Sequence, residues 1–264
     1  MSETKGTDPE ASIRKSVIRQ PLAAEGPVYS LNNSNPENPE LFLISGLTGQ
    51  VFPFKRTARL IADKLQVTGL LFPHLAGETD RYTTIVQTAE YFHGIVAASK
   101  REPIFVLGYS KGGAIAFELA SRLSNEGVSV GLILFDTSVR VLQKQKHPVR
   151  FLLQDISGII QRFVRRQSAY LKKDAIEHAR LDSIAALRKY RPEISKVPSV
   201  LIRPNTISPN RKFVEIEDLG WGQVTNLCGV LRTDGHHDDA FRGDYALPFS
   251  KAISQATDIL KKQL

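Results

Sequence analysis

The sequence predicts an α/β fold with a mostly parallel central sheet, flanking helices and an inserted helical lid. Short apolar runs of strand length alternate with segments of helical periodicity along most of the chain. The apolar runs are continuous, which is typical of parallel strands that are buried on both faces. One interval of about 60 residues, between the run that ends at Phe135 and the run that begins at Val200, is too long for an ordinary connection.

The expected elements follow one another from residue 27 onward, after a polar stretch over residues 1–26 that is expected to be a disordered tail. A short edge strand is expected over 27–29. The buried strands are predicted over 41–44, 67–72, 104–107, 130–135, 200–202 and 230–231. The helices between and after them are predicted to begin at Pro53, Thr84, Gly112 and Pro248. Residues 27–264 are therefore expected to form one domain, with the lid inserted at about 140–195.

Composition places the chain among ordinary globular proteins. It has 264 residues, of which 42% are hydrophobic, and its N-terminus lacks the pattern of a signal peptide. The absence of an apolar run of 18 residues predicts that no helix crosses a membrane. The single cysteine, Cys228, excludes a disulfide within the chain, so we expect a cytoplasmic protein with Cys228 buried in a strand.

The net charge of +8 is concentrated in the predicted lid. Residues 140–191 contain 13 lysines and arginines and four acidic residues, a charge of +9, so the rest of the chain carries −1. Such a segment is either a solvated helix face or a docking surface for an acidic partner. A membrane-surface helix is a weaker alternative, and nucleic-acid binding is not expected because no recognised motif accompanies the charge.

The segment Gly108-Tyr109-Ser110-Lys111-Gly112 has the pattern Gly-x-Ser-x-Gly between a predicted strand and a predicted helix. This arrangement is typical of the nucleophile elbow of α/β-hydrolases, in which a tight turn exposes the serine above the sheet. The alternative is a chance match in a glycine-rich turn. We expect Ser110 to be a nucleophile, which requires a base to remove its proton.

The order of a triad in this fold is serine, acid, histidine. Of the histidines that follow Ser110, His147 and His178 lie in the insertion, whereas His236 and His237 follow the last strand. Either of the last two is a candidate base, the alternative being a surface histidine. Asp136 directly follows the strand 130–135 and is the expected acid, unless it only caps a turn.

Two backbone amides are expected to stabilise the oxyanion. One is the N–H of Lys111, to whose side chain we assign no role, and the other is the N–H of Leu47 in the turn Ser45–Gly49. A plain glycine-rich turn is the alternative for Leu47. Neighbouring acids and histidines at 234–239 do not have the usual spacing of metal ligands, so we expect no metal or redox cofactor.

Several segments together resemble the thioesterase domains of non-ribosomal peptide and polyketide synthases. They are residues 41–49, 108–120, 132–137, 219–221 (Leu-Gly-Trp) and 235–237 (Gly-x-His). The resemblance implies that His237 is the base, that the acid follows the strand that ends at Phe135, and that a helical lid lies after it. Domains of this family are often fused to a carrier protein, and no carrier protein is present in this sequence, so we expect a freestanding editing or releasing enzyme. The chain departs from the family at Ser45-Gly46, where the family often has His-Gly or Pro-Gly.

The resemblance implies release of an acyl, peptidyl or polyketide chain from the phosphopantetheine arm of a carrier protein, which would dock near the basic lid. Five apolar lid residues are expected to bind the acyl chain: Phe151, Leu152, Ile156, Ile160 and Phe163. We expect a monomer. The alternatives are an esterase or acyltransferase acting on small free substrates, and a catalytically silent adaptor for carrier proteins.

Overall fold

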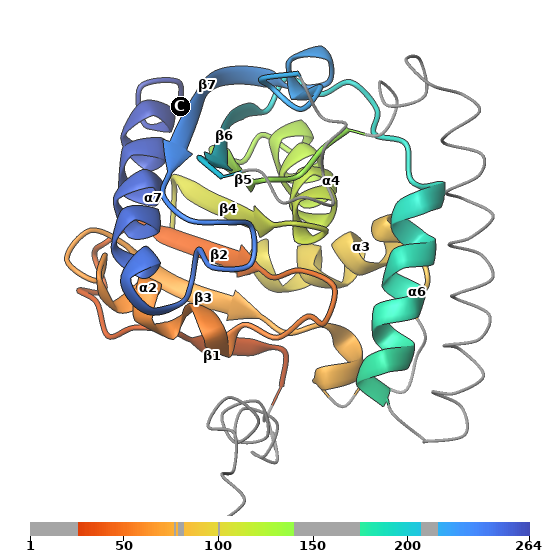
Figure 1. Cartoon of the computed structure of the whole chain (residues 1–264). Helices are drawn as coiled ribbons and strands as arrows, with labels where there is room; N and C mark the ends of the chain where they lie inside the picture. Colours follow the sequence, from red (N-terminus) through yellow and green to blue (C-terminus); the bar gives the residue numbers. More distant parts are fainter. Residues whose placement is uncertain (1–25, 77, 79–81, 100, 140–174, 207–215) are drawn as a thin grey trace, which may run out of the picture.

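A seven-stranded sheet forms the centre of the computed structural model (Figure 1), which describes residues 26–76, 78, 82–99, 101–139, 175–206 and 216–264. The strand order is β1-β3-β2-β4-β5-β6-β7. The strands are β1 (Val28–Ser30), β2 (Glu40–Ile44), β3 (Gln66–Leu70), β4 (Ile104–Tyr109), β5 (Val130–Phe135), β6 (Pro198–Pro204) and β7 (Asn226–Thr233). Only β1 pairs antiparallel, at the edge beside β3, so the mostly parallel sheet and the short edge strand are confirmed.

Helices cover both faces of the sheet. They are α2 (Lys55–Arg59), α3 (Ile85–Val96), α4 (Gly112–Asn125), α6 (Ala175–Lys189) and α7 (Ala246–Leu260), with short 3-10 turns η1 (Phe52–Phe54), η2 (Pro73–Leu75), η5 (Trp221–Gln223) and η6 (Gly243–Tyr245). Figure 1 shows α2 and α7 on one face, α3 and α4 on the other, and α6 farther out beyond α3 and α4.

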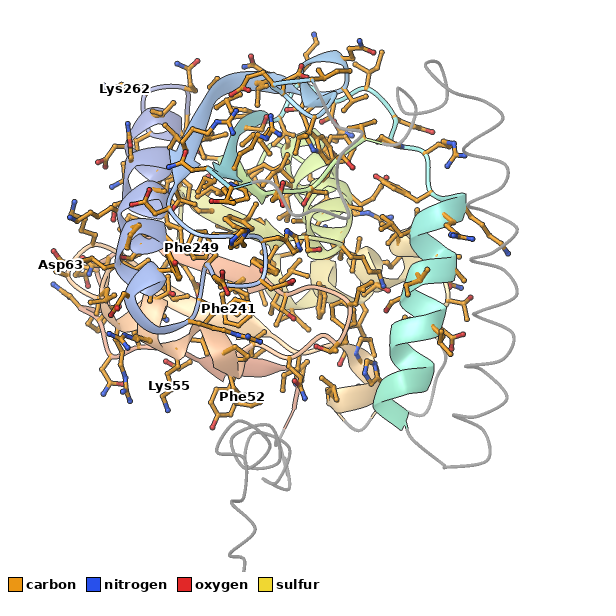
Figure 2. All side chains as sticks on the ribbon, in the orientation of Figure 1. Phe52, Lys55, Asp63, Phe241, Phe249 and Lys262 are labelled. Atoms are coloured by element: carbon orange, nitrogen blue, oxygen red, sulfur yellow. The ribbon has the colours of Figure 1, made fainter. Side chains whose placement is uncertain are left out.

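Each buried strand contributes to two apolar layers, which is why its sequence is continuously apolar. In β2, Phe42 and Ile44 belong to the layer under α3 and α4, whereas Leu41 and Leu43 belong to the layer under α2 and α7. In the second layer, the ring of Phe249 from α7 packs edge-on against Phe135 of β5 at 4.7 Å between centroids. Figure 2 shows Phe249 between α7 and the sheet.

One predicted helix begins where its capping sequence indicates, and another is shorter than predicted. Thr84 caps α3 with a reciprocal pair of side-chain bonds to Gln87, as the helix start predicted there requires. The helix predicted from Pro53 is shorter than its apolar pattern suggests. The α-helix α2 ends at Arg59, and the chain continues in hydrogen-bonded turns to Leu65. Within the described ranges, no helix combines the length and apolarity needed to span a bilayer.

The predicted burial of Cys228 needs correction, and the predicted tail and lid are largely outside the described residues. Cys228 is half-buried rather than buried, because β7 is the outermost strand and has a neighbour on one side only. Residues 1–25 of the predicted tail and residues 140–174 of the predicted lid lie outside the described residues, and the latter include Phe151, Leu152, Ile156, Ile160 and Phe163. The described remainder of the predicted lid contains α6, whose Leu181 and Ala186 are buried.

Candidate active site

Ser110 occupies a strained turn between β4 and α4. Its φ is 56°, in the left-handed region that residues other than glycine rarely adopt. Three hydrogen bonds hold the turn: Ser110 N–H donates to the Phe135 carbonyl at 2.9 Å, and Ser110 O accepts from Thr137 Oγ1 at 2.6 Å and from Gly113 N–H at 3.0 Å. The surrounding structure therefore imposes the conformation expected of a nucleophile elbow.

Glycines on either side of Ser110 let the strand and the helix approach closely. A Cβ at Gly108 would lie 2.6 Å from the Gly113 nitrogen, and one at Gly112 would lie 2.9 Å from the Ile44 carbonyl carbon. Real Cβ atoms essentially never come so close to backbone atoms. Backbone packing thus requires glycine at both positions of the pattern Gly-x-Ser-x-Gly.

Asp136 and His237 lie against each other although they are 101 residues apart. His237 Nδ1 is 2.6 Å from Asp136 Oδ2, and the two side chains are only 12% and 8% exposed. An ionised carboxylate can only accept, so with Asp136 as acceptor His237 donates through Nδ1–H, and Nε2 is the acceptor of the neutral imidazole in that tautomer. The neighbouring His236 is exposed.

The parallel register places Asp136 next to Ser110. Tyr109, the last residue of β4, pairs with Phe135, the last residue of β5, so Ser110 and Asp136 leave adjacent strands at the same edge. Asp136 also has a positive φ, 44°, and its N–H donates to the Ile202 carbonyl at 2.9 Å. Strain at both residues is maintained by bonds to the neighbouring strand, as at many functional sites.

Tyr109 connects the nucleophile strand to the histidine loop. Its hydroxyl donates a hydrogen bond to the His237 carbonyl, and its ring lies 5.2 Å from the His237 ring. Tyr109 is itself fixed by stacking on Phe135, with centroids 4.9 Å apart. Sequence reasoning missed this contact, because nothing in the residue's local pattern links it to a loop 128 positions later.

The Leu-Gly-Trp segment supports the loop that follows Asp136. Trp221 Nε1 donates to the Thr137 carbonyl at 2.7 Å, and the Leu219 carbonyl accepts from Val139 N–H at 2.9 Å. The Trp221 ring also packs against Phe117 of α4, at 5.2 Å. The segment therefore connects the loop after Asp136 to α4.

The two amides expected at the oxyanion lie in the neighbourhood of Ser110. The turn containing Leu47 closes through Gly49 N–H and the Gly46 carbonyl, and a Cβ at Gly46 would lie 3.6 Å from the Ser110 Cβ. Lys111 is the N-cap of α4, and amides at the start of a helix have no carbonyl partner within the helix. Both groups are thus at the edge of the sheet from which Ser110 emerges.

Two titratable side chains near this edge have strongly lowered pKa values. Burial lowers the pKa of Lys111 to about 7, although the charge of Asp182 opposes the shift. Burial and the nearby Lys111 lower the pKa of His74 to about 4, so His74 is neutral at pH 7. Sequence analysis assigned neither side chain a role, since burial is not visible in the motif.

The acidic and histidine side chains of the described ranges do not gather into a metal site. No three or more histidine, cysteine or acidic side chains come close enough there to hold a metal ion. In the segment 234–239, His237 is bonded to Asp136, and Asp234 Oδ1 accepts a hydrogen bond from Asn205 Nδ2 at 2.9 Å.

A family model and curated proteins that match this chain point to the same family. Residues 39–237 match the family model described as a thioesterase domain. Among curated proteins, the nonribosomal peptide synthetases atrA and btyA of Aspergillus terreus are 32% identical over 108 residues and 33% identical over 102 residues. These segments are 40% and 38% of this chain, and they span only 12% and 11% of the two synthetases.

Solved structures share the fold at low sequence identity. The NocB thioesterase domain of the nocardicin cluster has a TM-score of 0.63 and 21% identity, over 88% of this chain and 99% of that one. The type II thioesterase BorB of the borrelidin cluster has a TM-score of 0.65 and 19% identity, over 89% and 97%. The four-domain synthetase AB3403 has a TM-score of 0.67 and 19% identity, over 93% of this chain and 21% of that one. The predicted α/β-hydrolase architecture agrees with these neighbours.

Proposed function

The chain belongs to the thioesterase domain family, and from this premise we propose that it releases acyl, peptidyl or polyketide chains from the phosphopantetheine thioester of a carrier protein. The observation that carries the proposal is the hydrogen-bonded pair of His237 and Asp136 at the strand ends beside a strained Ser110. In this arrangement the chemistry needs no metal or redox cofactor, since a paired histidine can activate a serine.

The reaction begins when His237 Nε2 removes the proton from Ser110 Oγ, which attacks the thioester carbonyl carbon. Asp136 holds the Nδ1–H tautomer and stabilises the imidazolium that forms. The backbone amides of Leu47 and Lys111 donate to the oxyanion, aided by the positive end of α4. The carbon–sulfur bond then breaks, and His237 protonates the departing thiol.

The acyl-enzyme is resolved in the second half of the reaction. His237 removes a proton from water, or from a nucleophile within the acyl chain, and the new bond to the carbonyl carbon displaces Ser110 Oγ. The serine recovers its proton from His237. Water gives hydrolysis, and an internal nucleophile gives a cyclic product.

The carrier protein is proposed to dock near the basic lid, where opposite charge would speed its approach. The +9 segment over 140–191 supports this direction of docking. The substrate chain would lie under the apolar lid residues. We further propose that the protein acts in the reducing cytoplasm, because it has a single cysteine. We also propose that it acts as a monomer and binds neither nucleic acid nor a membrane.

The test is intact-protein mass spectrometry on a panel of carrier proteins loaded with acyl, aminoacyl and polyketide chains. The wild-type protein should unload at least one class and should carry a transient acyl group. Ser110→Ala should abolish both, and Asp136→Asn should slow unloading by about 10³–10⁴-fold, because the histidine loses its correct tautomer. Unloading by Ser110→Ala at the wild-type rate would rule out the mechanism.

Two further outcomes separate the alternatives. Hydrolysis of small esters with no preference for carrier-bound thioesters would favour an esterase. A fluorophosphonate that fails to label Ser110 in the folded protein would favour a catalytically silent adaptor.

A further inference from the structure

The side chain of Lys111 is buried directly beside the proposed nucleophile. It follows Ser110 in the chain, and the residue is 5% exposed. Lysine is almost never fully buried unless it is paired, because removing an ammonium group from water is costly. A buried lysine at this position therefore requires a structural or functional reason.

Lys111 has no counter-ion within ion-pair distance among the described residues. With the described residues, Lys111 Nζ forms no ion pair or hydrogen bond. It lies over the Phe72 ring, 5.1 Å from the ring centroid. Asp182 of α6 acts on it only through its longer-range field, which does not offset the effect of burial on the pKa of Lys111. The ammonium is thus incompletely compensated by the groups that the structure describes.

A second polar group in the same neighbourhood also lacks a partner within the described ranges. Nε2 of His74 is buried there without a hydrogen bond. The His74 ring lies edge-on to Phe72, with centroids 6.1 Å apart, so the imidazole and the ammonium flank one aromatic ring. A buried imidazole nitrogen without a hydrogen bond, next to a lysine residue that is 5% exposed and has no ion-pair partner among the described residues, calls for a ligand or a functional role.

The packing of Phe72 places this neighbourhood beside Ser110. The backbone of Gly49 lies against the Phe72 side chain so closely that a Cβ at Gly49 would overlap it. Gly49 closes the turn that begins at Gly46, and Gly46 lies beside Ser110. The turn contacts both Ser110 and Phe72, and the Lys111 ammonium lies over the Phe72 ring, so this group of residues is next to the elbow.

We infer that Lys111 Nζ, with His74 beside it, binds a carboxylate on the acyl chain close to the thioester, so that the preferred substrates are carboxylated acyl groups. This inference rests on the proposed function and names its substrate class. A carboxylate would supply the counter-charge that the described residues do not. Charge-assisted hydrogen bonds in a desolvated site are the strong ones, so they discriminate well against an uncharged analogue.

The phosphate of the pantetheine arm is a less suitable anion for this site. It is separated from the thioester by the whole length of the arm, whereas Lys111 is adjacent to the residue that attacks the thioester carbon. N-Acetylcysteamine thioesters lack that phosphate altogether. They therefore test the acyl side of the site alone.

The experiment compares malonyl, succinyl and glutaryl thioesters of N-acetylcysteamine, each with its own methyl ester, after subtraction of the rate with Ser110→Ala. For at least one chain length, the wild-type kcat/KM should be about ten- to a hundredfold higher for the free carboxylate than for the ester. In Lys111→Met this ratio should fall to about 1 or below. Lys251→Met, which changes an exposed lysine on α7, should keep the wild-type ratio.

A binding measurement gives a readout that does not depend on turnover. Titration calorimetry of Ser110→Ala at about pH 8, in two buffers with different ionisation enthalpies, should detect proton uptake when the carboxylated thioester binds. The uptake is expected because an anion raises the pKa of Lys111 from about 7. It should be absent with the methyl ester and in Ser110→Ala combined with Lys111→Met.

The outcomes distinguish this inference from the proposed function. Equal ratios in the wild type and in Lys111→Met, together with no proton uptake, would overturn the inference while leaving hydrolysis intact. If no thioester is hydrolysed and Ser110 is not labelled by a fluorophosphonate, the proposed function fails. The calorimetry would then still report whether a carboxylate binds at Lys111.

Discussion

Ser110 and Asp136 adopt backbone conformations that their side chains disfavour, and the same hydrogen bonds connect them. Ser110 N–H is bonded to the residue that precedes Asp136, and Thr137, which follows Asp136, is bonded to the Ser110 carbonyl. Moving either residue would therefore disturb the other. Two strained positions that are coupled in this way keep Ser110 and Asp136 in a constant relation, which would lower the cost of organising the transition state of the proposed reaction.

Lys111 should make the stability of the fold depend on pH. The unfolded lysine keeps its proton up to about pH 10.5, whereas the folded one releases it near pH 7, faced by His74 of η2 and Asp182 of α6. Between these values the unfolded state binds more protons, so the free energy of unfolding rises with pH across this window.

Lys111→Met removes the buried charge and should therefore remove the destabilisation that this charge causes. We expect the variant to be more stable than the wild type by roughly 2 kcal/mol at about pH 6, and the difference to shrink by about pH 9. Urea unfolding of both proteins at the two pH values measures this. Lys251→Met should differ little from the wild type at either pH, and a pH-independent gain in Lys111→Met would contradict the assignment.

At the scale of elements, α4 is positioned by what its first turn can approach. Its initial glycines lie against the carbonyl end of β2 and against Thr137, while its apolar face packs beneath α3 and against Trp221. The helix therefore presents its N-terminus to Ser110 only because Gly112 and Gly113 carry no side chain. Gly112 and Gly113 therefore contribute through close packing and not through backbone flexibility.

A matched pair of glycine substitutions tests this account. Gly94 is an exposed interior residue of α3, and beyond its chain neighbours and the nearby helix backbone no described atom lies within 4 Å of the position that a methyl group would take. Gly94→Ala should therefore raise the free energy of unfolding by about 0.5–1 kcal/mol. Gly112→Ala should lower it by roughly 3 kcal/mol or prevent folding, because backbone atoms would have to move. Denaturant unfolding measures both, and effects of the same sign would contradict the packing argument.

At the scale of the whole molecule, the sheet brings together residues that are far apart in the chain. The turn after β2, Ser110 after β4, Asp136 after β5 and the His237 loop after β7 all leave the carboxyl edge of parallel strands. This is the edge at which ligands of open α/β sheets bind. On the sequence numbering the predicted lid is inserted after β5, directly following the acid's loop.

The charge of the predicted lid gives a prediction about partners. Raising the salt concentration from about 0.05 M to about 0.5 M should lower kcat/KM several-fold for a carrier-bound thioester, because screening shortens the reach of the +9 segment. The N-acetylcysteamine thioester of the same acyl group should be little affected. Kinetics at the two salt concentrations measure this.

A charge-reversal pair provides the control. Lys189→Glu, at an exposed position of α6 within the basic segment, should weaken the salt dependence, whereas Lys251→Glu on α7 should not. A salt response that is equal for the carrier-bound and the small thioester would contradict docking at this segment.

The sequence by itself determined the elements of the sheet and the order of the chemistry-bearing residues. Continuous apolar runs identified the strands because burial on both faces leaves no polar position, and Gly-x-Ser-x-Gly identified the elbow because only glycine permits that approach. Such signals are local, so they can be recognised without knowing the rest of the fold. They located Ser110 and Asp136 at strand ends.

Only the tertiary structure decided which groups meet. From spacing alone His236 and His237 were equal candidates, and the fold places His237 against Asp136 while leaving His236 exposed. The bond from Tyr109 to the His237 loop was equally invisible in the sequence, as was the burial of Lys111 without a counter-ion among the described residues. Contacts of this kind depend on strand register and on neighbours far away in the chain, which local periodicity does not encode.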